Sequence, residues 1–355
     1  MKEYSMIVGL DLGDTYIRYC ALDAEGEVLS EGRIRTTEKG LRGHFERLEP
    51  CLVALETGTH TWWTARLLSE LGHEVVVANT RRVRAISHNE RKSDRADAEM
   101  LARLARTDRE LLHPVRMRGE QAQTDLAMLK ARDALVRART KLINTVRGLL
   151  KSFGTVLPKC SAHAFADKVR DSVPAEHKDA LAALLDHIGT LTESIDEYDA
   201  KLEAMVMEKY PEAQLLRDIP GVGPLTSLGF VLVVDEPMRF ENSRDIGPYL
   251  GLTPRRDQSG DCDPQLGITK AGNGFMRRLL VCAAQHIMAH ESADGDLRRW
   301  AWKLAGGEGS KDKRRKKRAV VALARKLAVV MLSLWKSASC YEPFRQKTPA
   351  PEATT

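Results

Sequence analysis

The sequence predicts a mixed α/β domain followed by an all-α region that contains long helices. Three observations predict this fold class: strand-like and helical patterns alternate over residues 5–78, apolar residues recur at heptad spacing over 120–150 and 181–205, and a Gly-Pro turn opens an apolar helix within 218–232. With 355 residues, 43% hydrophobic and 29% charged, the chain has the composition of a globular protein and room for two or three domains.

The first part of the chain carries five strand patterns and two helical ones. The strands are expected at 5–13, 16–24, 27–35, 51–56 and 74–79, and the helices at 37–48 and 61–72. Short Gly and Asp turns join the first three strands, as in a meander. The resulting order, β-β-β-α-β-α-β, is that of a ribonuclease-H-like core. We assign this domain to residues 1–118.

The middle of the chain, residues 119–211, is expected to be a helical linker of two long antiparallel helices. In the first helix, apolar residues recur every seven positions at Met128, Leu135, Leu142 and Leu149. In the second helix, the heptad positions are Leu181, Leu184, Ile188, Leu191, Ile195, Tyr198, Leu202 and Met205. This spacing is typical of a coiled-coil seam, either within the chain or between chains.

The last part, residues 212–345, is expected to be helical. The segment "DIPGVGPLTSLGFVL" has the form of a helix-hairpin-helix element, in which Pro220, Gly221 and Gly223 make a tight turn into an apolar helix. Backbone N–H groups at such a turn can bind a phosphate, although an ordinary Gly-Pro loop has the same composition. Two or three basic helices are expected over 271–340.

The distribution of charge predicts a polyanionic partner. Residues 81–151 hold 18 Lys and Arg against 9 Asp and Glu, and residues 298–336 hold 13 against 2, whereas the segments before and between these blocks are acidic. One such block is usually a solvated surface, but two favour nucleic acid.

Several features predict a cytoplasmic protein that does not enter a membrane. The six cysteines are scattered without a Cys-x-x-Cys pair, which is typical of a reducing compartment and argues against structural zinc. No signal peptide is expected at the N-terminus. Arg325 and Lys326 interrupt the longest apolar run, residues 319–335.

Four carboxylates are the candidate catalytic residues. Asp94 and Asp97 share a helix face at the start of an apolar-periodic run, Asp11 lies inside an apolar strand, and Glu56 ends the fourth strand. A buried acid is costly unless it is paired or bound to a metal. If the first and fourth strands are neighbours, the four acids can bind Mg²⁺ (or Mn²⁺). The alternative is structural: Asp94 as a helix N-cap, Asp97 as a first-turn acid and Glu56 as a solvated strand end.

A second interpretation of the N-terminus is the phosphate loop of sugar kinases and actin-like ATPases, Asp-x-Gly-x-Thr. That fold needs a second such loop and a Gly-Gly adenosine motif. The later candidates, at 244–251 and 305–309, lie in helical or basic sequence without a preceding strand. The long heptad helices also do not fit this interpretation.

The motifs as a whole resemble a known family. "GLDLG", "LETG" and "KSDRADAEMLARLAR" are similar to the Asp-Glu-Asp-Asp motifs of insertion-sequence transposases whose catalytic domain is like the Holliday-junction resolvase RuvC. The segments "IPGVGPLTSLGFVLVVDEPMRFENSRDIGPYLGLTPRRDQSG" and "LGITKAGNGFMRRLL" are similar to the C-terminal transposase domain of that family. The resemblance covers about residues 5–340.

This resemblance implies a site-specific DNA recombinase that moves its own element. It implies that Asp11, Glu56, Asp94 and Asp97 hold Mg²⁺, and that Ser259 attacks the DNA phosphate. It also implies donor and target DNA as substrates, guidance by a structured bridge RNA, and homodimers that pair into a tetramer with a site shared between subunits.

From its residues alone, the segment around Ser259 is an ordinary Ser-Gly turn, and Ser259 as nucleophile rests on the resemblance. Arginine forks nearby match phosphate oxygens. The cations expected to bind nucleic acid are Arg255, Arg256, Lys270, Arg277, Arg278, Arg314, Arg315, Lys316 and Lys317.

Two further functions stay open. The first is a structure-specific, Holliday-junction-type endonuclease that cuts DNA without rejoining it; only rejoining should require Ser259. The second is a nucleic-acid scaffold without catalysis, in which the acids are structural. Metal binding separates that scaffold from both enzymes.

Overall fold

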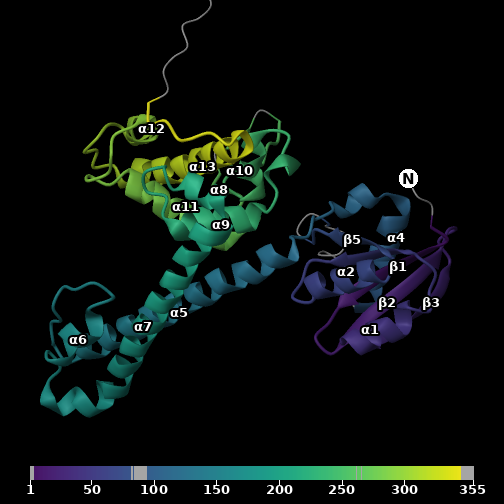
Figure 1. Ribbon diagram of the computed structural model, residues 1–355, viewed down its shortest axis with the longest axis horizontal. Helices are drawn as coiled ribbons and strands as arrows, with labels where there is room; N and C mark the ends of the chain where they lie inside the picture. The colour runs from purple at the N-terminus through teal and green to yellow at the C-terminus, as the bar shows by residue number, and fades with distance from the viewer. Residues whose placement is uncertain (1–3, 81–82, 84–93, 261, 265, 345–355) are drawn as a thin grey trace, which may run out of the picture. The chain divides into compact units, whose positions relative to one another are not determined.

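The computed structural model of the chain describes residues 4–80, 83, 94–260, 262–264 and 266–344 (Figure 1). The chain divides into two compact units, Met1–Met117 and Arg118–Thr355. The first unit is α/β, and the described part of the second is helical apart from two isolated β-bridges. This confirms the predicted mixture of α/β and all-α parts. The expected boundary near residue 211 stays a prediction, because helices on both sides of it share one hydrophobic core.

The first unit is built on a five-stranded sheet in the order β3-β2-β1-β4-β5. The strands β1 to β3 form an antiparallel meander, while β4 is parallel to β1 and β5 is parallel to β4. Their bounds are β1 Met6–Leu12, β2 Tyr16–Asp23, β3 Val28–Arg35, β4 Leu52–Glu56 and β5 Glu74–Ala78. The predicted strand order along the chain, and the expected pairing of the first strand with the fourth, are confirmed.

Helices cover the two faces of this sheet differently. The helices α1, Glu38–Phe45, and α2, Thr61–Glu70, lie on one face and pack large side chains such as Phe45 and Leu68 against it (Figure 1). On the other face, α4, Asp94–Thr107, packs mainly small side chains against the sheet. A short 3-10 helix, Arg109–Leu112, follows α4. The small side chains let α4 approach the sheet more closely.

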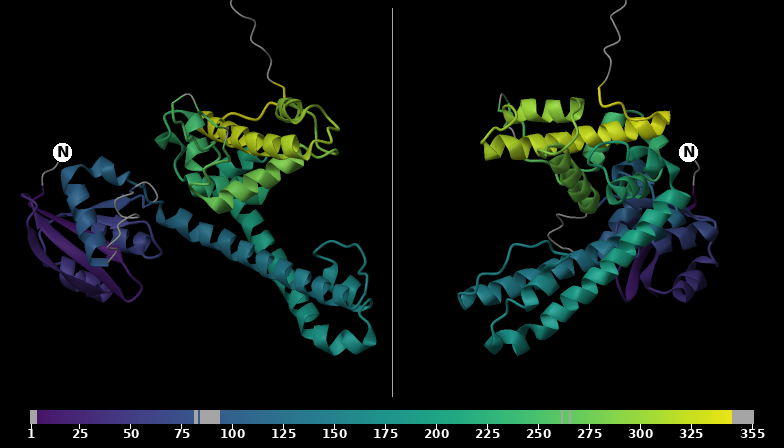
Figure 2. Two further views of the ribbon diagram at one scale, coloured as in Figure 1. Left: turned by 180° about the vertical axis from the view of Figure 1, so that it is seen from behind. Right: turned by 60° about the vertical axis from the view of Figure 1, so that its left-hand side comes forward.

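The second unit begins with two long antiparallel helices, α5, Glu120–Ser152, and α7, Lys178–Lys209, which lie side by side (Figure 2). Arg132 of α5 donates two hydrogen bonds of 2.9 Å to Asp199 of α7, and about two turns further on Arg139 donates to Thr192. Because the residue numbers rise along α5 as they fall along α7, the helices are antiparallel, as predicted.

The predicted seam of α5 is confirmed only in part within the chain, because Met128 and Leu142 pack against hydrophobic clusters but Leu135 and Leu149 do not. The buried side chains of α5 are Ala122, Asp125, Leu126, Leu129, Ile143, Val146 and Leu150, whereas the side chain of Leu149 in the predicted row is 43% exposed. The cause is the polar middle of the helix, where Arg132 and Arg139 face α7 and displace the apolar register. The prediction for α7 holds better, since Leu181, Ile188, Ile195, Leu202 and Met205 are buried.

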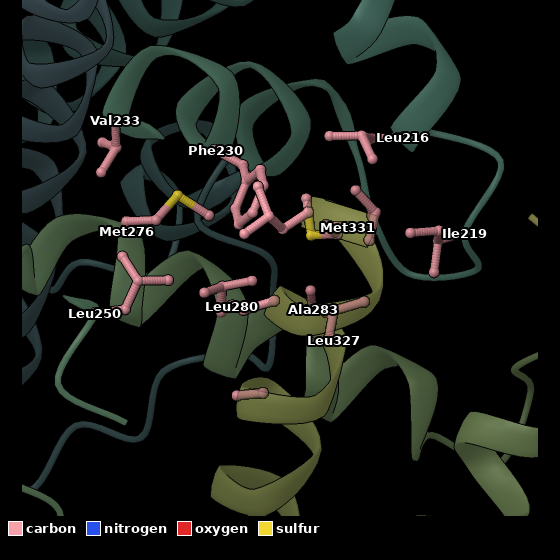
Figure 3. Close-up of a cluster of buried hydrophobic side chains, with 14 of the residues drawn as sticks. Leu216, Ile219, Phe230, Val233, Leu250, Met276, Leu280, Ala283, Leu327 and Met331 are labelled. Carbon is pink, nitrogen blue, oxygen red and sulfur yellow. The ribbon is translucent and has the colours of Figure 1, made fainter. Parts of the chain in front are cut away.

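The helix α6 packs in a separate cluster with α5 and α7, and the other helices surround one core, in which α9 is buried on all sides from Thr226 to Val234 (Figure 3). Phe230 of α9 lies among side chains from α11 and α13, including Met276 and Met331. The bounds of these helices are α6 Phe165–Arg170, α8 Pro211–Leu216, α9 Pro224–Val234, α10 Ile246–Tyr249, α11 Gly274–Ile287, α12 Asp296–Ala305 and α13 Lys313–Ser337, with 3-10 turns at Ala175–His177, Pro237–Arg239 and Ser243–Asp245.

The glycine turn between α8 and α9 has a packing role. Gly221 has a φ of +81°, and a Cβ at this position would lie 3.0 Å from the carbonyl oxygen of Ala283 in α11. Helices α8 and α9 flank this turn, as the predicted helix-hairpin-helix element requires, and the three basic helices α11, α12 and α13 are confirmed. Binding of a phosphate by the turn stays a prediction.

Candidate active site and nucleic-acid surface

Two of the predicted acids lie at the same edge of the sheet. Leu10 of β1 is in register with Leu55 of the parallel strand β4, so that Asp11 and Glu56 take the next position at the carboxyl end of each strand. Ile7 and Leu52 point into the core under α4, and side chains alternate along a strand. Asp11 and Glu56 therefore both face α4.

A glycine sets how closely α4 approaches β1. A Cβ on Gly9 would overlap the carbonyl oxygen of Ala98 and lie 2.6 Å from the amide nitrogen of Ala102. The backbone of α4 therefore rests directly on the strand, two residues before Asp11 and on the same face.

The direction of α4 brings its first turn to the acidic edge. Near its other end, Arg103 and Arg106 donate hydrogen bonds of 3.2 Å to the carbonyl oxygens of Gly26 and Ala24 in the β2–β3 turn. That turn adjoins the amino end of β1, because Met6 pairs with Asp23. The start of α4 therefore lies toward the carboxyl end of β1, where Asp11 is.

Asp97 is buried in this first turn, where the residue is only 7% exposed. It precedes Ala98, the residue in contact with Gly9. Asp94 begins α4, but its side chain lies outside the described part of the chain. Among the described residues, no group of three or more His, Cys, Asp or Glu side chains forms a ready metal site. That all four acids form one metal site stays a prediction.

The loops that follow Asp11 and Glu56 are tied to each other by His60, which sequence reasoning missed. Trp63 donates its Nε1–H to Nδ1 of His60 at 3.1 Å, which leaves the proton of the neutral imidazole on Nε2. Nε2 in turn donates to Asp14, at 3.3 Å from Oδ1. The hydroxyl of Thr61 donates to the carbonyl oxygen of Glu56 at 2.7 Å, so His60 stays close to this acid along the chain.

A cation also lies beside the acids. Arg18 of β2 is paired with Asp11 of β1 in the antiparallel register, on the same face of the sheet. No spacing in the sequence marks Arg18, His60 or Asp14, because each reaches the edge through strand pairing or loop folding. A histidine or arginine following a candidate acid by a few residues is too common to single out.

Ser259 lies in the second unit at the tip of a β-hairpin. The hairpin is closed by the bridge between Pro254 and Ile268, and at its tip the N–H of Ser259 donates to the carbonyl oxygen of Cys262 at 3.1 Å while Cys262 returns the same bond. Gly260 turns the chain with a φ of +56°. Ser259 is exposed, and Arg255 and Arg256 lie on the same hairpin.

The predicted cations divide between an open groove and internal contacts. Arg255, Arg256, Lys270 and Lys317 line a groove of about 1640 Å³ along α13. Arg277 instead donates to the carbonyl oxygens of Leu250 and Ala271, and Arg278 pairs with Asp133 at 2.7 Å. These contacts give Arg277 and Arg278 a role in holding the fold. Their binding of nucleic acid stays a prediction.

The basic run at the start of α13 is capped by a carboxylate. The side chain of Asp312 accepts from the backbone N–H groups of Arg314 and Arg315. The hydrogen bond from Arg315, with a smaller contribution from Arg314, holds the pKa of Asp312 below its usual value. Arg314 and Arg315 are exposed, while Lys316 lies over the ring of Trp302 at 5.1 Å. The capped helix thus presents this run to solvent.

None of the described helices is both long and apolar enough to cross a membrane. All six cysteines are free thiols, and burial raises the pKa of Cys51 to about 12.

Comparison with known proteins assigns the chain to a family. Residues 8–154 match the DEDD domain family of IS110 elements, described as "Transposase", and residues 213–298 match the family described as "Transposase IS116/IS110/IS902 family". The chain is 32% identical to the transposase for insertion sequence element IS1328 of Yersinia enterocolitica, over 83% of this chain and 87% of that protein. It is 29% identical to the transposase for IS1111A of Coxiella burnetii, over 94% and 90%, and 29% identical to a probable family 20 transposase of Pseudomonas aeruginosa, over 95% and 98%.

Both halves of the chain thus match the same kind of protein, in the same order as the two units of the structure. The match includes the segments that carry Asp11, Glu56, Asp94, Asp97 and Ser259. The chain belongs to the IS116/IS110/IS902 family of insertion-sequence transposases.

Proposed function

We propose that this transposase is a site-specific recombinase that cuts and rejoins DNA at the ends of its own insertion sequence, with Mg²⁺ (or Mn²⁺) and Ser259, under the guidance of a structured bridge RNA. The observation that carries the proposal is the convergence of Asp11, Glu56 and the first turn of α4 at one edge of the sheet. The strand order 3-2-1-4-5, with three antiparallel strands followed by two parallel ones, fits a RuvC-like, ribonuclease-H-like domain.

The donor chemistry of this edge fits a divalent metal. Carboxylate oxygens are hard ligands of the kind that Mg²⁺ prefers, and a buried carboxylate such as Asp97 is costly without a compensating charge. Asp11, Glu56, Asp94 and Asp97 are the residues that would hold the ion. When bound, the metal would supply Lewis-acid stabilisation of charge at a scissile phosphate.

Ser259 would act as the nucleophile. In the proposed step, its Oγ forms a bond to the DNA phosphorus, the bond from phosphorus to a deoxyribose oxygen breaks, and that oxygen takes up a proton. Attack by a second DNA strand end reverses the step and releases Ser259. A serine hydroxyl needs activation at neutral pH. The exposed hairpin tip makes Ser259 accessible, and Arg255 and Arg256 are suited to hold the phosphate.

A homodimer that assembles into a tetramer is part of the proposal. Met128, Leu135, Leu142 and Leu149 repeat every seven residues on α5, and none of them is fully buried, although Met128 and Leu142 are partly buried against hydrophobic clusters of the same chain. Strict heptad spacing is the signature of a coiled-coil seam, so this row is suited to a second copy of the chain. The site would then be shared, with the acids and Ser259 from different subunits.

The experiment is a strand-transfer reaction with donor DNA, target DNA and the RNA transcribed beside the gene. Wild type should give recombinant product; Asp11→Ala should give neither cut nor joined DNA, and Ser259→Ala should give no joined DNA. A mixture of the Asp11→Ala and Ser259→Ala proteins should regain some activity, because a shared site takes each half from a different subunit. Cut DNA without any joined product, from wild type, would favour the alternative of a Holliday-junction-type endonuclease.

The proposed guidance by RNA and association with the nucleoid rest on the resemblance to the family, and the charge of the chain is compatible with both. Two segments rich in Lys and Arg, residues 81–151 and 298–336, supply contacts for phosphate backbones. Binding to both RNA and DNA should fall steeply with salt. Product that forms equally well without RNA would contradict RNA guidance and leave DNA recombination standing.

A further inference from the structure

The groove along α13 has a composition that the proposed reaction does not by itself require. We propose that this groove binds an unpaired segment of nucleic acid, with bases on its apolar floor and phosphates on its cations. The proposal rests on the proposed function, since it names the kind of strand that the second unit holds beside Ser259.

The walls of the groove come from several segments of the second unit, among them the turn at residues 242–244. One side is α13, and the others include the hairpin 254–268 that carries Ser259, the first turns of α12, and residues 339–342. Its volume is about 1640 Å³. The groove therefore leads along α13 to the base of the hairpin with Ser259 at its tip.

Helix α13 has two different apolar faces. Leu323, Leu327 and Met331 are fully buried in the core. On the side of the groove, Val321, Val329 and Val330 are only half-buried and form a floor. The groove side extends from Lys317 to Ser333, about 24 Å at 1.5 Å per residue. This length of half-exposed apolar surface has room for several nucleotides.

The charge of the groove is strongly positive. Eight Lys and Arg side chains line it, against the three acids Asp263, Asp296 and Glu342. Asp263 is itself paired with Arg256 at 3.1 Å. Arg325 is half-buried on the floor and its side chain packs over Gly247, yet no carboxylate in the described part of the chain forms an ion pair with it. An arginine in that position is available for a phosphate.

Aromatic rings complete the lining. Trp300 of α12 faces the groove, half-buried, and Nζ of Lys326 lies 4.3 Å from the centre of its ring. Tyr341 lines the groove near its other wall. Cations that track a backbone together with aromatic rings that stack on bases are the combination by which proteins bind single strands.

The apolar floor decides between an unpaired strand and a duplex. A duplex keeps its base faces stacked inside and presents phosphates and groove edges, so it would leave Val321, Val329 and Trp300 uncovered. An unpaired strand offers both base faces and phosphates to the same surface. An acidic amphipathic peptide would also match the charge, and it is therefore a competitor in the test.

The test measures binding of the full-length protein to a fluorescent single-stranded oligonucleotide of about 15 nucleotides, and to the same sequence as a duplex. Trp300→Ala should weaken single-strand binding by about 5- to 100-fold, as expected for the loss of one base–aromatic stack, and change duplex binding less than twofold. Trp300→Phe should recover part of the loss. Arg325→Gln should weaken single-strand binding. It should also reduce the slope of log affinity against log salt concentration by the amount expected for about one phosphate contact. Lys303→Ala, on α12 but outside the groove lining, is the matched control.

Three outcomes would overturn the proposal. The first is an equal loss of affinity for single strand and duplex in the groove variants, and the second is an unchanged single-strand affinity in both Trp300→Ala and Arg325→Gln. The third is displacement of the bound oligonucleotide by an acidic amphipathic peptide. Thermal melting of each variant checks that it is folded. Ser259→Ala and Asp97→Asn should bind the single strand like wild type. Failure of the groove proposal therefore shows in binding, whereas failure of the proposed recombination shows in product formation.

Discussion

The two units of the chain place their charged side chains in opposite ways. In the first unit, Asp11 and Glu56 are positioned by strand register, and Asp97 by the close contact of α4 with Gly9. In the second unit, the cations are spread along one side of α13 and the hairpin beside it. Strand register fixes the position of a side chain to a single residue. One side of a helix fixes only the row of residues along which a side chain can lie.

The way in which each unit positions its charged side chains determines what that unit can do. Chemistry at a phosphate needs groups held in a defined geometry, which a sheet edge supplies. Binding a long polyanion needs a positive electrostatic potential and many weak contacts, which a cationic groove supplies. Substitutions in the first unit should therefore act on the reaction steeply and one residue at a time, and substitutions of cations in the second unit should act gradually and additively.

The largest expected effect is that of removing one buried acid. Asp97→Asn keeps the shape of the side chain but removes its charge, so it should lower DNA cleavage by more than about 100-fold, since even groups that only support a metal ligand are worth 10- to 100-fold. The measurement is the rate of cleavage in Mg²⁺. A cleavage rate within a few-fold of wild type would show that Asp97 is not part of the catalytic site. It would also contradict the expected steep effect of substitutions in the first unit.

The next effect concerns how the acids are positioned. Gly9→Ala inserts a Cβ into the backbone of α4, which should cost about 1–3 kcal/mol of unfolding free energy and lower cleavage, because the first turn of α4 must shift. Gly43→Ala is the matched control, since a Cβ on Gly43 of α1 meets nothing within 4 Å. Equal stability of the two variants in denaturant would contradict the close contact of α4 with β1.

A smaller effect is expected from the loop contact that follows the acids. His60→Ala removes the link between Asp14 and Trp63 and should raise the Mg²⁺ concentration needed for half-maximal cleavage by about tenfold, because the loops after Asp11 and Glu56 lose their connection. His60→Gln has both a donor and an acceptor and should restore much of the affinity. An unchanged Mg²⁺ requirement in His60→Ala would mean that the contact connects the loops without affecting metal binding.

Much of the first unit could be predicted from the sequence. Period-two patterns and short turns gave every strand of the sheet, and the neighbouring first and fourth strands brought Asp11 and Glu56 together as expected. Arg18, His60 and Asp14 were missed because they reach the edge through cross-strand pairing and a folded loop, neither of which leaves a period in the sequence.

The second unit was harder to predict for a physical reason. The heptad row of Met128, Leu135, Leu142 and Leu149 predicts a seam, but the fully buried residues in the second half of α5 are Ile143, Val146 and Leu150. In the middle of the pair, Arg132 and Arg139 make polar contacts with α7 instead. Ser259 carries no local signal, and its proposed role rests on the resemblance to the family. The groove exists only once the hairpin, α12 and α13 are packed together.

The central claim is that the acids of the first unit and Ser259 of the second act in one reaction. The most direct test is to react the protein with labelled DNA in Mg²⁺, to denature it, and to identify any DNA-linked peptide by mass spectrometry. The account predicts one covalent adduct, on Ser259, which is absent in Ser259→Ala and also absent in Asp97→Asn, although both variants still bind DNA. An adduct that persists in Ser259→Ala, or DNA that is cut by wild type without any adduct, would contradict the account and favour attack by water.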